Sequence, residues 1–256
     1  MSDLKVAFVQ CPLEWESPVE NRKRIEALVK EHNPSCDILV LPETFTTGFS
    51  IRPEMTEEWN GETLAWMKQL AHQTKAMVMG SFLVKAGAKA YNRLALVHTD
   101  GVKHYDKRHT FSLAKEGEHI AQGTQRVIHP YKGWNIRPLI CYDLRFPVWC
   151  RNQEDTDFMV FVANWPERRV YAWKQLLIAR AIENQCYVLG VNRIGVEPSG
   201  IAYTGQSCLI DPMGELIVDA QDQAGIFQGE LKRDFLEKIR QKLNFQADRD
   251  SFTIEG

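Results

Sequence analysis

Short apolar segments alternate with longer amphipathic segments in the first half of the chain. The apolar runs predict strands at residues 4–10, 37–41 and 76–82. Between them, apolar residues recur at helical spacing with charged residues in the intervening positions, which predicts helices at 19–32 and 64–73. Strands that alternate with helices in this way are typical of an α/β protein.

The second half of the chain repeats this alternation. Apolar runs predict strands at residues 136–140, 158–163 and 186–192, and a long segment with helical spacing predicts a helix at 171–183. A further strand is predicted at 225–230, at the edge of a sheet. No period recurs along the chain as it would in a repeat protein.

Hairpins are also predicted, which changes the expected sheet type. Turn-forming residues, Asp100-Gly101 in one case and a segment containing Pro212 in the other, separate two pairs of predicted strands: 93–98 with 102–106, and 207–210 with 216–218. Because hairpins join antiparallel strands, we expect α/β layers with mixed sheets instead of purely parallel sheets.

Composition favours one globular domain over residues 1–256. Apolar residues make up 44% and charged residues 25%, and no linker-like segment divides the chain. Lys and Arg total 31 against 33 for Asp and Glu, so net charge does not attract nucleic acid or an anionic membrane. The sequence has neither an apolar span long enough for a membrane nor a signal-peptide pattern, and we expect a cytoplasmic protein.

The sequence contains no motif for a metal or a nucleotide cofactor. The six cysteines are far apart, and the seven histidines form no His-Glu-x-x-His segment. The glycine-rich fingerprints of dinucleotide and phosphate-loop sites are missing as well. We therefore expect reduced thiols, no metal and no cofactor.

Three residues with complementary chemistry directly follow apolar runs. Glu43 follows ILVLP, Lys107 follows VKHYD and Cys141 follows RPLI. Strand ends of this kind carry ligands and chemistry in α/β sheets. A thiol is a strong nucleophile once deprotonated, a carboxylate can take its proton, and an ammonium can stabilise a developing oxyanion.

By pattern alone, each of these residues also has a structural interpretation. Cys141 suits a buried packing thiol, Glu43 a loop carboxylate, and Lys107 a solvated run of charge. In favour of a reactive Cys141, the polar residues after it predict a helix start, whose N–H groups would lower the pKa of the thiol. Cys11 is the second candidate thiol, and His109 allows a rival Cys–His pair.

Three segments around these residues resemble motifs of the nitrilase, or carbon-nitrogen hydrolase, superfamily. LPETFTTGF (41–49), YDKRHTF (105–111) and CYDLRFP (141–147) match its motif regions in order. VANWP (162–166) and ARAIENQCYVLGVNRIG (179–195) extend the resemblance over nearly the whole chain. Within the superfamily, the motifs are most similar to the bacterial omega-amidase branch, whose members hydrolyse the terminal amide of 2-oxo dicarboxylic acid monoamides such as 2-oxoglutaramate and 2-oxosuccinamate.

The resemblance implies a catalytic Glu-Lys-Cys triad. Glu43 matches the general base, Lys107 the oxyanion lysine and Cys141 the nucleophile. The family also has a second glutamate after the lysine, for which Glu116 fits best and Glu118 is the alternative. No metal or organic cofactor takes part in this chemistry.

The resemblance also implies a fold and an assembly. The expected fold is a four-layer α-β-β-α sandwich with two mixed sheets, and the expected assembly is a homodimer. A helix that carries Arg180, Glu183 and Asn184 resembles a segment near the dimer interface, although these residues are equally compatible with an ordinary helix surface.

The expected partner is a small amide substrate, and three residues are candidates to contact it. The backbone N–H of Tyr142 follows the thiol and is placed to bind the oxyanion. Arg145 is the candidate for a substrate carboxylate or else a structural ion pair, and Trp165 for a pocket wall or else a core residue.

Three alternatives to an omega-amidase remain from the sequence. The first is another amidase or an N-carbamoyl amidohydrolase of the same superfamily. The second is a non-catalytic binding protein with this fold. The third is a peptidase that pairs Cys141 with His109, for which His109 and not Lys107 would be essential.

Overall fold

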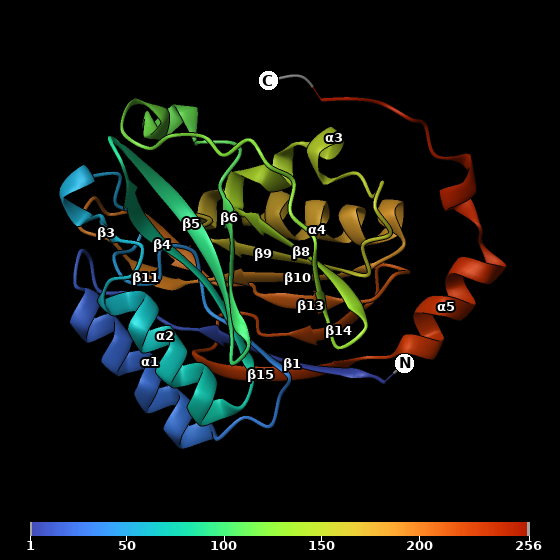
Figure 1. The fold of residues 1–256 in the computed structure, drawn as a ribbon, viewed down its shortest axis with the longest axis horizontal. Helices are drawn as coiled ribbons and strands as arrows, with labels where there is room; N and C mark the ends of the chain where they lie inside the picture. Colours follow the sequence, from blue (N-terminus) through green and yellow to red (C-terminus); the bar gives the residue numbers. More distant parts are fainter. Residues whose placement is uncertain (1, 255–256) are drawn as a thin grey trace.

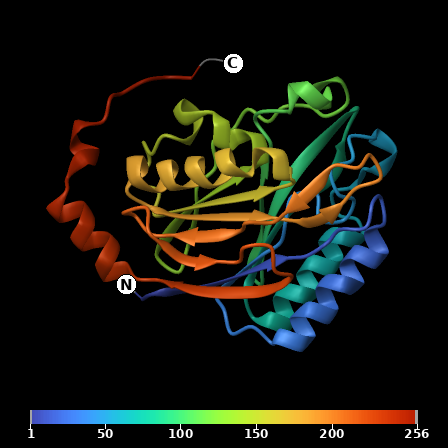
Figure 2. The ribbon, with the colours of Figure 1, turned by 180° about the vertical axis from the view of Figure 1, so that it is seen from behind.

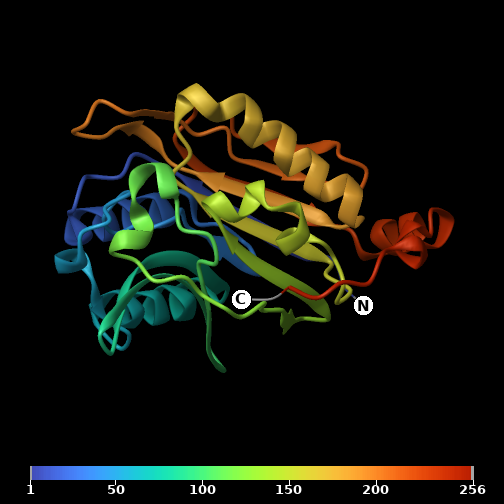
Figure 3. The same ribbon diagram turned by 90° about the horizontal axis from the view of Figure 1, so that it is seen from above.

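Two mixed β-sheets pack face to face between helices in the computed structural model of the chain, which describes residues 2–254 (Figure 1). Helices α1 (Pro18–His32) and α2 (Glu62–Thr74) cover the outer face of one sheet. Helix α4 (Val170–Asn184) covers the outer face of the other (Figure 3). The four-layer α-β-β-α sandwich expected from the sequence is confirmed.

The first sheet has seven strands with a parallel centre. Strands β1, β2 and β4 are parallel, and β5, β6 and β15 add to them in antiparallel fashion. The short strand β3 (Glu57–Glu58) pairs with β4 outside the main path. The order of the path is β15 (Gly225–Leu231), β1 (Leu4–Gln10), β2 (Ile38–Val40), β4 (Met77–Ala86), β5 (Lys89–His98) and β6 (Gly101–Asp106).

The second sheet repeats this arrangement with six strands. Strands β8, β9 and β10 are parallel, and β7, β13 and β14 are antiparallel to their neighbours. The hairpin β11 (Ile194–Val196) and β12 (Ala202–Thr204) forms a separate two-stranded sheet. The order is β14 (Leu216–Asp219), β13 (Cys208–Ile210), β10 (Tyr187–Asn192), β9 (Phe158–Ala163), β8 (Trp134–Ile140) and β7 (His129–Tyr131).

Alternation of side chains along the strands of the first sheet builds two apolar layers. Val6 and Phe8 of β1 belong to the core between the sheets, whereas Ala7 and Val9 belong to the core beneath α1 and α2. Successive side chains of a strand point to opposite faces, so one strand contributes to both layers. Burial on both faces explains why these strands are apolar runs in the sequence.

The remaining helices are short or peripheral. Helix α5 (Arg233–Lys242) lies at one side of the sandwich, beyond the end of β15 (Figure 2). Helix α3 has four residues (Pro147–Cys150). The 3-10 turns are η1 (Pro53–Met55), η2 (Ser112–Ala114), η3 (Glu116–Glu118), η4 (Cys141–Arg145), η5 (Glu167–Arg169) and η6 (Phe245–Asp248).

The predicted strands and helices agree with the structure to within a few residues. The predictions for 4–10 and 158–163 match β1 and β9 without change, and 225–230 corresponds to β15 at the edge of its sheet. Five short or charged elements were not predicted: β3, β7, β11, β12 and α5. Over residues 2–254, no helix has both the length and the apolar character that crossing a membrane would require.

Candidate active site

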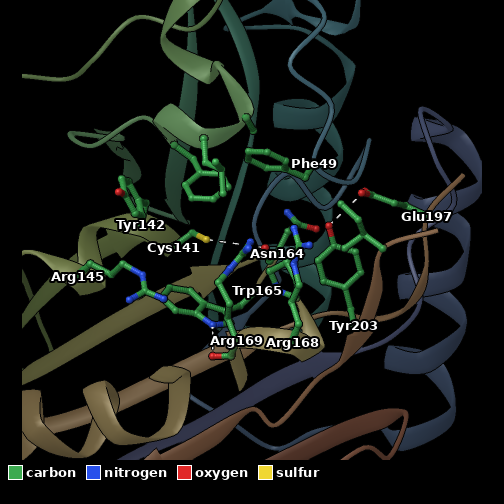
Figure 4. A pocket seen from close by; sticks show the side chains of 15 residues that line it. Phe49, Cys141, Tyr142, Arg145, Asn164, Trp165, Arg168, Arg169, Glu197 and Tyr203 are labelled. Carbon is green, nitrogen blue, oxygen red and sulfur yellow. Dashed lines mark hydrogen bonds between the residues drawn. The ribbon is translucent and has the colours of Figure 1, made fainter. Parts of the chain in front are cut away.

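A cavity of about 250 Å³ opens where loops from both sheets meet (Figure 4). The parallel strands β8 and β9 end at this cavity, and β2 of the facing sheet ends close by, as contacts of Glu43 show below. Its walls combine aromatic and cationic side chains with one thiol: Phe49, Phe111, Leu113, Ala114, Cys141, Tyr142, Arg145, Asn164, Trp165, Pro166, Arg168, Arg169, Glu197, Ile201 and Tyr203.

Glu43 lies three residues after the end of β2 and is completely buried. Its Oε1 accepts hydrogen bonds from Lys107 Nζ at 2.9 Å and from Asn92 Nδ2 at 2.8 Å. Its Oε2 accepts the backbone N–H of Asn164 at 2.7 Å. These donors stabilise a charged carboxylate away from water, so the loop-surface interpretation of Glu43 is wrong.

Lys107 follows β6 and is also completely buried, between two carboxylates. Besides Glu43, its Nζ contacts both carboxylate oxygens of Glu116, at 3.0 and 2.9 Å. Burial alone would lower the pKa of Lys107, but the charges of Glu116 and Glu43 outweigh it and raise that pKa. Lys107 is therefore a fixed cation, and its interpretation as part of a solvated charge run is wrong.

Glu116, and not Glu118, is the second glutamate at Lys107. Glu116 is buried, and its Oε2 also accepts the backbone N–H of Phe111 at 2.6 Å. The pKa of Glu116 is raised overall. Burial is the main cause, Lys107 opposes it, and the negative charge of Glu43 adds to it. Glu118 is exposed and forms an ion pair with Lys115 at 3.7 Å.

Cys141 occupies a strained position at the cavity. It directly follows β8 with φ of +43°, a left-handed conformation that costs about 1–3 kcal/mol for a side chain of this kind. Its side chain lies at the cavity, and its Sγ lies 4.0 Å from the carbonyl oxygen of Asn164 (Figure 4).

The pKa of the Cys141 thiol is raised, whereas the sequence predicted that it would be lowered. Burial and the negative charge of Glu43 raise the pKa of Cys141 well above the usual value, and Lys107 only partly opposes them. The expected helix after Cys141 is a 3-10 turn, η4, and a turn of this length lacks the aligned peptides that would lower the pKa. At neutral pH the thiol is therefore protonated.

Asp143 fixes the backbone next to Cys141. Its carboxylate accepts hydrogen bonds from the backbone N–H of Ile140 at 3.0 Å and from Tyr105 Oη at 2.8 Å. It also accepts the backbone N–H of His109, whose ring nitrogen Nδ1 lies 2.8 Å away. These contacts hold the strained turn between β8 and η4 in place.

The two rival candidates from the sequence do not lie at the Cys141 thiol. The His109 ring stacks on Phe146 at 3.6 Å and contacts Asp143. Cys11 is buried, and burial raises its pKa to about 11. Among residues 2–254, neither side chain belongs to the wall of the cavity.

Arg145 and Trp165, both predicted to contact substrate, line the cavity together. The Arg145 guanidinium lies over the Trp165 ring, 4.8 Å from its centroid (Figure 4). Trp165 is buried, and its Nε1 donates to the carbonyl oxygen of Arg169 at 2.8 Å. Tyr142 also lines the cavity, and its ring packs edge-on against Phe111 and Phe146.

Several cavity residues were not predicted from the sequence. Asn164 bridges the sheets, because its Nδ2 donates to the Glu43 carbonyl oxygen and to Thr44 Oγ1, each at 2.9 Å. The others are Phe49, Phe111, Leu113, Ala114, Pro166, Arg168, Arg169, Glu197, Ile201 and Tyr203. The two arginines come shortly after the VANWP segment, separated from it by Glu167, and this position after a strand was the available signal.

Arg180 and Asn184 on α4 are buried, which excludes an ordinary helix-surface role for them. Arg180 Nη2 donates to the carbonyl oxygen of Leu144 at 2.7 Å, and its Nη1 donates to Glu183 at 2.8 Å. Arg180 therefore ties α4 to the turn that carries Cys141.

No group of three or more potential metal ligands occurs within residues 2–254.

The fold and the buried Glu-Lys-Cys arrangement define a class of hydrolase, and comparison with known proteins agrees. Residues 5–241 match the carbon-nitrogen hydrolase family, and the chain belongs to it. The resemblance seen in the motifs is thereby confirmed.

Individual relatives are similar over the full length. The chain is 41% identical to the omega-amidase YafV of Escherichia coli, over 99% of this chain and 100% of the relative. It is 31% identical to the 2-oxoglutaramate amidase of Bacillus subtilis, over 93% of this chain and 94% of that protein. A crystal structure of a superfamily member from Xanthomonas campestris, which carries an arsenic adduct in its active site, has a TM-score of 0.97 and 38% identity over 100% of both chains.

Proposed function

We propose that this protein is an omega-amidase that hydrolyses the terminal amide of 2-oxo dicarboxylic acid monoamides to the dicarboxylate and ammonia. The observation that carries this proposal is the buried cluster of Glu43, Lys107 and Glu116 beside the Cys141 thiol. The choice of substrate class is supported by two relatives, an omega-amidase and a 2-oxoglutaramate amidase, which are similar to this chain over at least 93% of its length.

The first chemical step is attack by Cys141 on the amide carbon. Because the resting thiol is protonated, Glu43 takes its proton as the carbon–sulfur bond forms. The electrons of the carbonyl double bond move to oxygen, and the resulting oxyanion is stabilised by Lys107 and by the backbone N–H of Tyr142.

The second step releases ammonia, and the third regenerates the thiol. Glu43 delivers its proton to the amide nitrogen as the carbon–nitrogen bond breaks, which leaves a thioester on Cys141. Glu43 then takes a proton from a water molecule that attacks the thioester. As the carbon–sulfur bond breaks, that proton returns to the sulfur. Glu116 holds Lys107 in position throughout.

Substrate recognition in this proposal uses the walls of the cavity. Arg145 is half-buried and offers N–H donors that suit a carboxylate. Trp165 supplies an apolar wall and keeps the guanidinium of Arg145 over its ring. Both residues lie at the same cavity as Cys141, as a small substrate requires.

Ammonia release from 2-oxoglutaramate tests the function. Wild-type protein and Cys141→Ala are compared on 2-oxoglutaramate, glutamine, a carbamoyl amino acid and a simple nitrile. Selective release from 2-oxoglutaramate that requires Cys141 is the expected result. Cys141-dependent hydrolysis of another substrate alone would replace the omega-amidase assignment by another amidase or carbamoylase, and silence on all four would favour a binding protein.

We also propose that the protein is a homodimer that pairs through the outer face of α4. Tyr171 and Ile182 are exposed by 78% and 50%, and the half-buried Ile178 lies on the same face. Apolar side chains at this helical spacing on an outer face favour a protein contact over solvent.

A further inference from the structure

Three arginines line the cavity, and two of them, Arg145 and Arg169, lie against aromatic rings. Arg145 lies over Trp165, and the Arg169 guanidinium lies 5.2 Å from the centroid of the Phe111 ring. Within residues 2–254, neither arginine forms an ion pair with a carboxylate. Aromatic faces therefore hold both groups in position while their N–H donors remain available.

The two arginines are also linked structurally through Trp165. Its ring supports Arg145, and its Nε1 donates to the backbone carbonyl of Arg169. Figure 4 shows these three side chains together on the wall that also carries Cys141. A ligand bound at the thiol thus meets two cations at once.

The charge of this wall is not neutralised by the acid that shares the cavity. Glu197 lines the same cavity, but its carboxylate accepts hydrogen bonds from Ser199 Oγ at 2.8 Å and from Tyr203 Oη at 3.2 Å. Burial, and then the neighbouring charges of Arg168 and Arg145, lower the pKa of Arg169. Positive charge is therefore concentrated on one side of the cavity, and an anion bound there would relieve the repulsion.

We propose that Arg169, acting with Arg145, binds the carboxylate and the adjacent 2-oxo oxygen of the substrate and excludes an ammonium group from the same carbon. Arg169 is then a specificity-determining residue that selects 2-oxo acid amides over amino acid amides. This inference rests on the proposed omega-amidase function and extends it to the choice between an oxo and an amino group.

The chemistry of a 2-oxo acid fits two guanidinium groups. Its carboxylate and neighbouring carbonyl present several acceptor oxygens close together, which one arginine alone cannot fully satisfy in a bidentate pair. An amino acid carries an ammonium on the same carbon, and two nearby cations repel it. The same pair of arginines therefore attracts one substrate and rejects the other.

Binding of unreactive analogues tests this selection without relying on hydrolysis. 2-Oxopentanoate, pentanoate and norvaline have the same carbon chain and differ only at the second carbon. Calorimetry measures their affinities for wild-type protein, Arg169→Gln and Arg169→Lys. Lys68→Gln is the control, because it removes one positive charge from an exposed position on α2.

We expect wild-type protein to bind 2-oxopentanoate most tightly and norvaline most weakly. Arg169→Gln should weaken 2-oxopentanoate binding about 10- to 100-fold, which corresponds to the loss of hydrogen bonds to a charged group. The difference in affinity between 2-oxopentanoate and norvaline should become smaller. Arg169→Lys should still exclude norvaline, because it keeps the charge. Lys68→Gln should match wild type. Unchanged affinities in Arg169→Gln, or wild-type binding of norvaline as tight as that of 2-oxopentanoate, would overturn the inference.

Ammonia release from 2-oxoglutaramate, measured on the same preparations, separates this inference from the function on which it rests. A rise in KM with a small change in kcat is expected for Arg169→Gln, because the lost contacts bind substrate and transition state alike. Hydrolysis with the same KM in Arg169→Gln would reject the role of Arg169 and retain the omega-amidase. Selective binding of 2-oxopentanoate without any hydrolysis would reject the omega-amidase and retain the anion site.

Discussion

Glu116 places both of its carboxylate oxygens within 3.0 Å of Lys107 Nζ, and the two side chains are almost entirely excluded from solvent. Glu43, which follows β2 in the same sheet as β6, contacts the same ammonium at 2.9 Å. One buried cation thus has two carboxylate partners. Such a group is costly to bury unless every charge is paired, so the geometry depends on all three residues.

Replacement of Glu116 by Gln is expected to lower kcat with a smaller effect on KM. The amide keeps one acceptor for Lys107 but removes a charge that fixes the ammonium, and a misplaced oxyanion donor costs about 10²–10³ in kcat. Steady-state kinetics on the best substrate measure this loss. Glu118→Gln is the matched control, because Glu118 lies two residues away, is exposed and pairs with the exposed Lys115. Equal losses in both variants would contradict the role of Glu116.

The Glu-Lys-Cys triad and a Cys–His pair predict opposite effects of replacing Lys107 and His109. Lys107→Ala removes the only side-chain cation bound to Glu43 in the described part of the chain, and it should reduce kcat by about 10² or more. His109→Ala should retain turnover, because its ring contacts Asp143 and Phe146 away from the thiol. The thermal unfolding midpoint of His109→Ala is measured as a check on its stability. Loss of activity with an unchanged midpoint would support the Cys–His alternative.

Local sequence patterns predicted most of the fold. Strand β1 was predicted from its apolar pattern, and the turn at Asp100-Gly101 does join β5 to β6. Helix α5 was missed because its few apolar residues stand among charged ones, and only Leu236 among them is fully buried. Strands of two or three residues, such as β11, are too short to show a period.

The site was less predictable, because it depends on contacts between distant segments. Glu43 and Asn164 are 121 residues apart, and no local pattern shows that they bond. The charged run that contains Lys107 predicts that its side chain is exposed to solvent. In the structure, the loop at Gly123 instead packs on the Asp106 carbonyl, so closely that a Cβ at Gly123 would lie 2.2 Å from the carbonyl oxygen. The proposed triad was predicted from its motifs, and Arg169 lies outside those three motifs.

Asn164→Ala is expected to lower both activity and stability. Its side chain donates to the Glu43 carbonyl oxygen and to Thr44 Oγ1, and loss of such buried bonds costs about 1–3 kcal/mol of unfolding free energy. Glu43 would also lose its fixed position, so kcat should fall. Urea unfolding and steady-state kinetics measure the two effects.

Asn152→Ala separates these two effects. Asn152 is also buried, and its Nδ2 donates to the carbonyl oxygens of Thr156 and Asn184, outside the cavity. Its replacement should lower stability by a similar amount and leave kcat unchanged. A fall in kcat of the same size in both variants would indicate that Asn164 acts only through general stability.

The proposed dimer predicts the effect of a charge on α4. Ile182 is half-exposed on the outer face of the helix, so Ile182→Glu should leave the monomer folded and disrupt a contact that buries this side chain. Sedimentation of wild-type protein should give a dimer, and sedimentation of the variant a monomer. Val19→Glu is the matched control, because it places the same charge at a half-exposed apolar position on α1, on the opposite outer layer of the sandwich, and it should leave the dimer intact. A wild-type monomer would reject the proposal.

Buried thiols predict a loss of stability at high pH. Burial, and then the charge of Asp219, raise the pKa of Cys208 from 9.0 to about 12 in the folded protein. Above about pH 9 the unfolded chain loses the thiol proton and the folded chain keeps it, so the unfolding free energy falls as pH rises. The contribution is fully present below pH 9.0 and disappears as pH approaches about 12.

Cys208→Ala isolates this contribution from the titration of lysines and tyrosines, which both proteins share. Each raised thiol adds up to about 1.4 kcal/mol per pH unit to the slope, so the unfolding free energy of wild type should fall more steeply than that of the variant. Urea unfolding under reducing conditions at several values between about pH 8 and about pH 11 measures both slopes. Parallel slopes would mean that Cys208 ionises equally in the folded and unfolded chains, and that its burial does not protect the thiol proton.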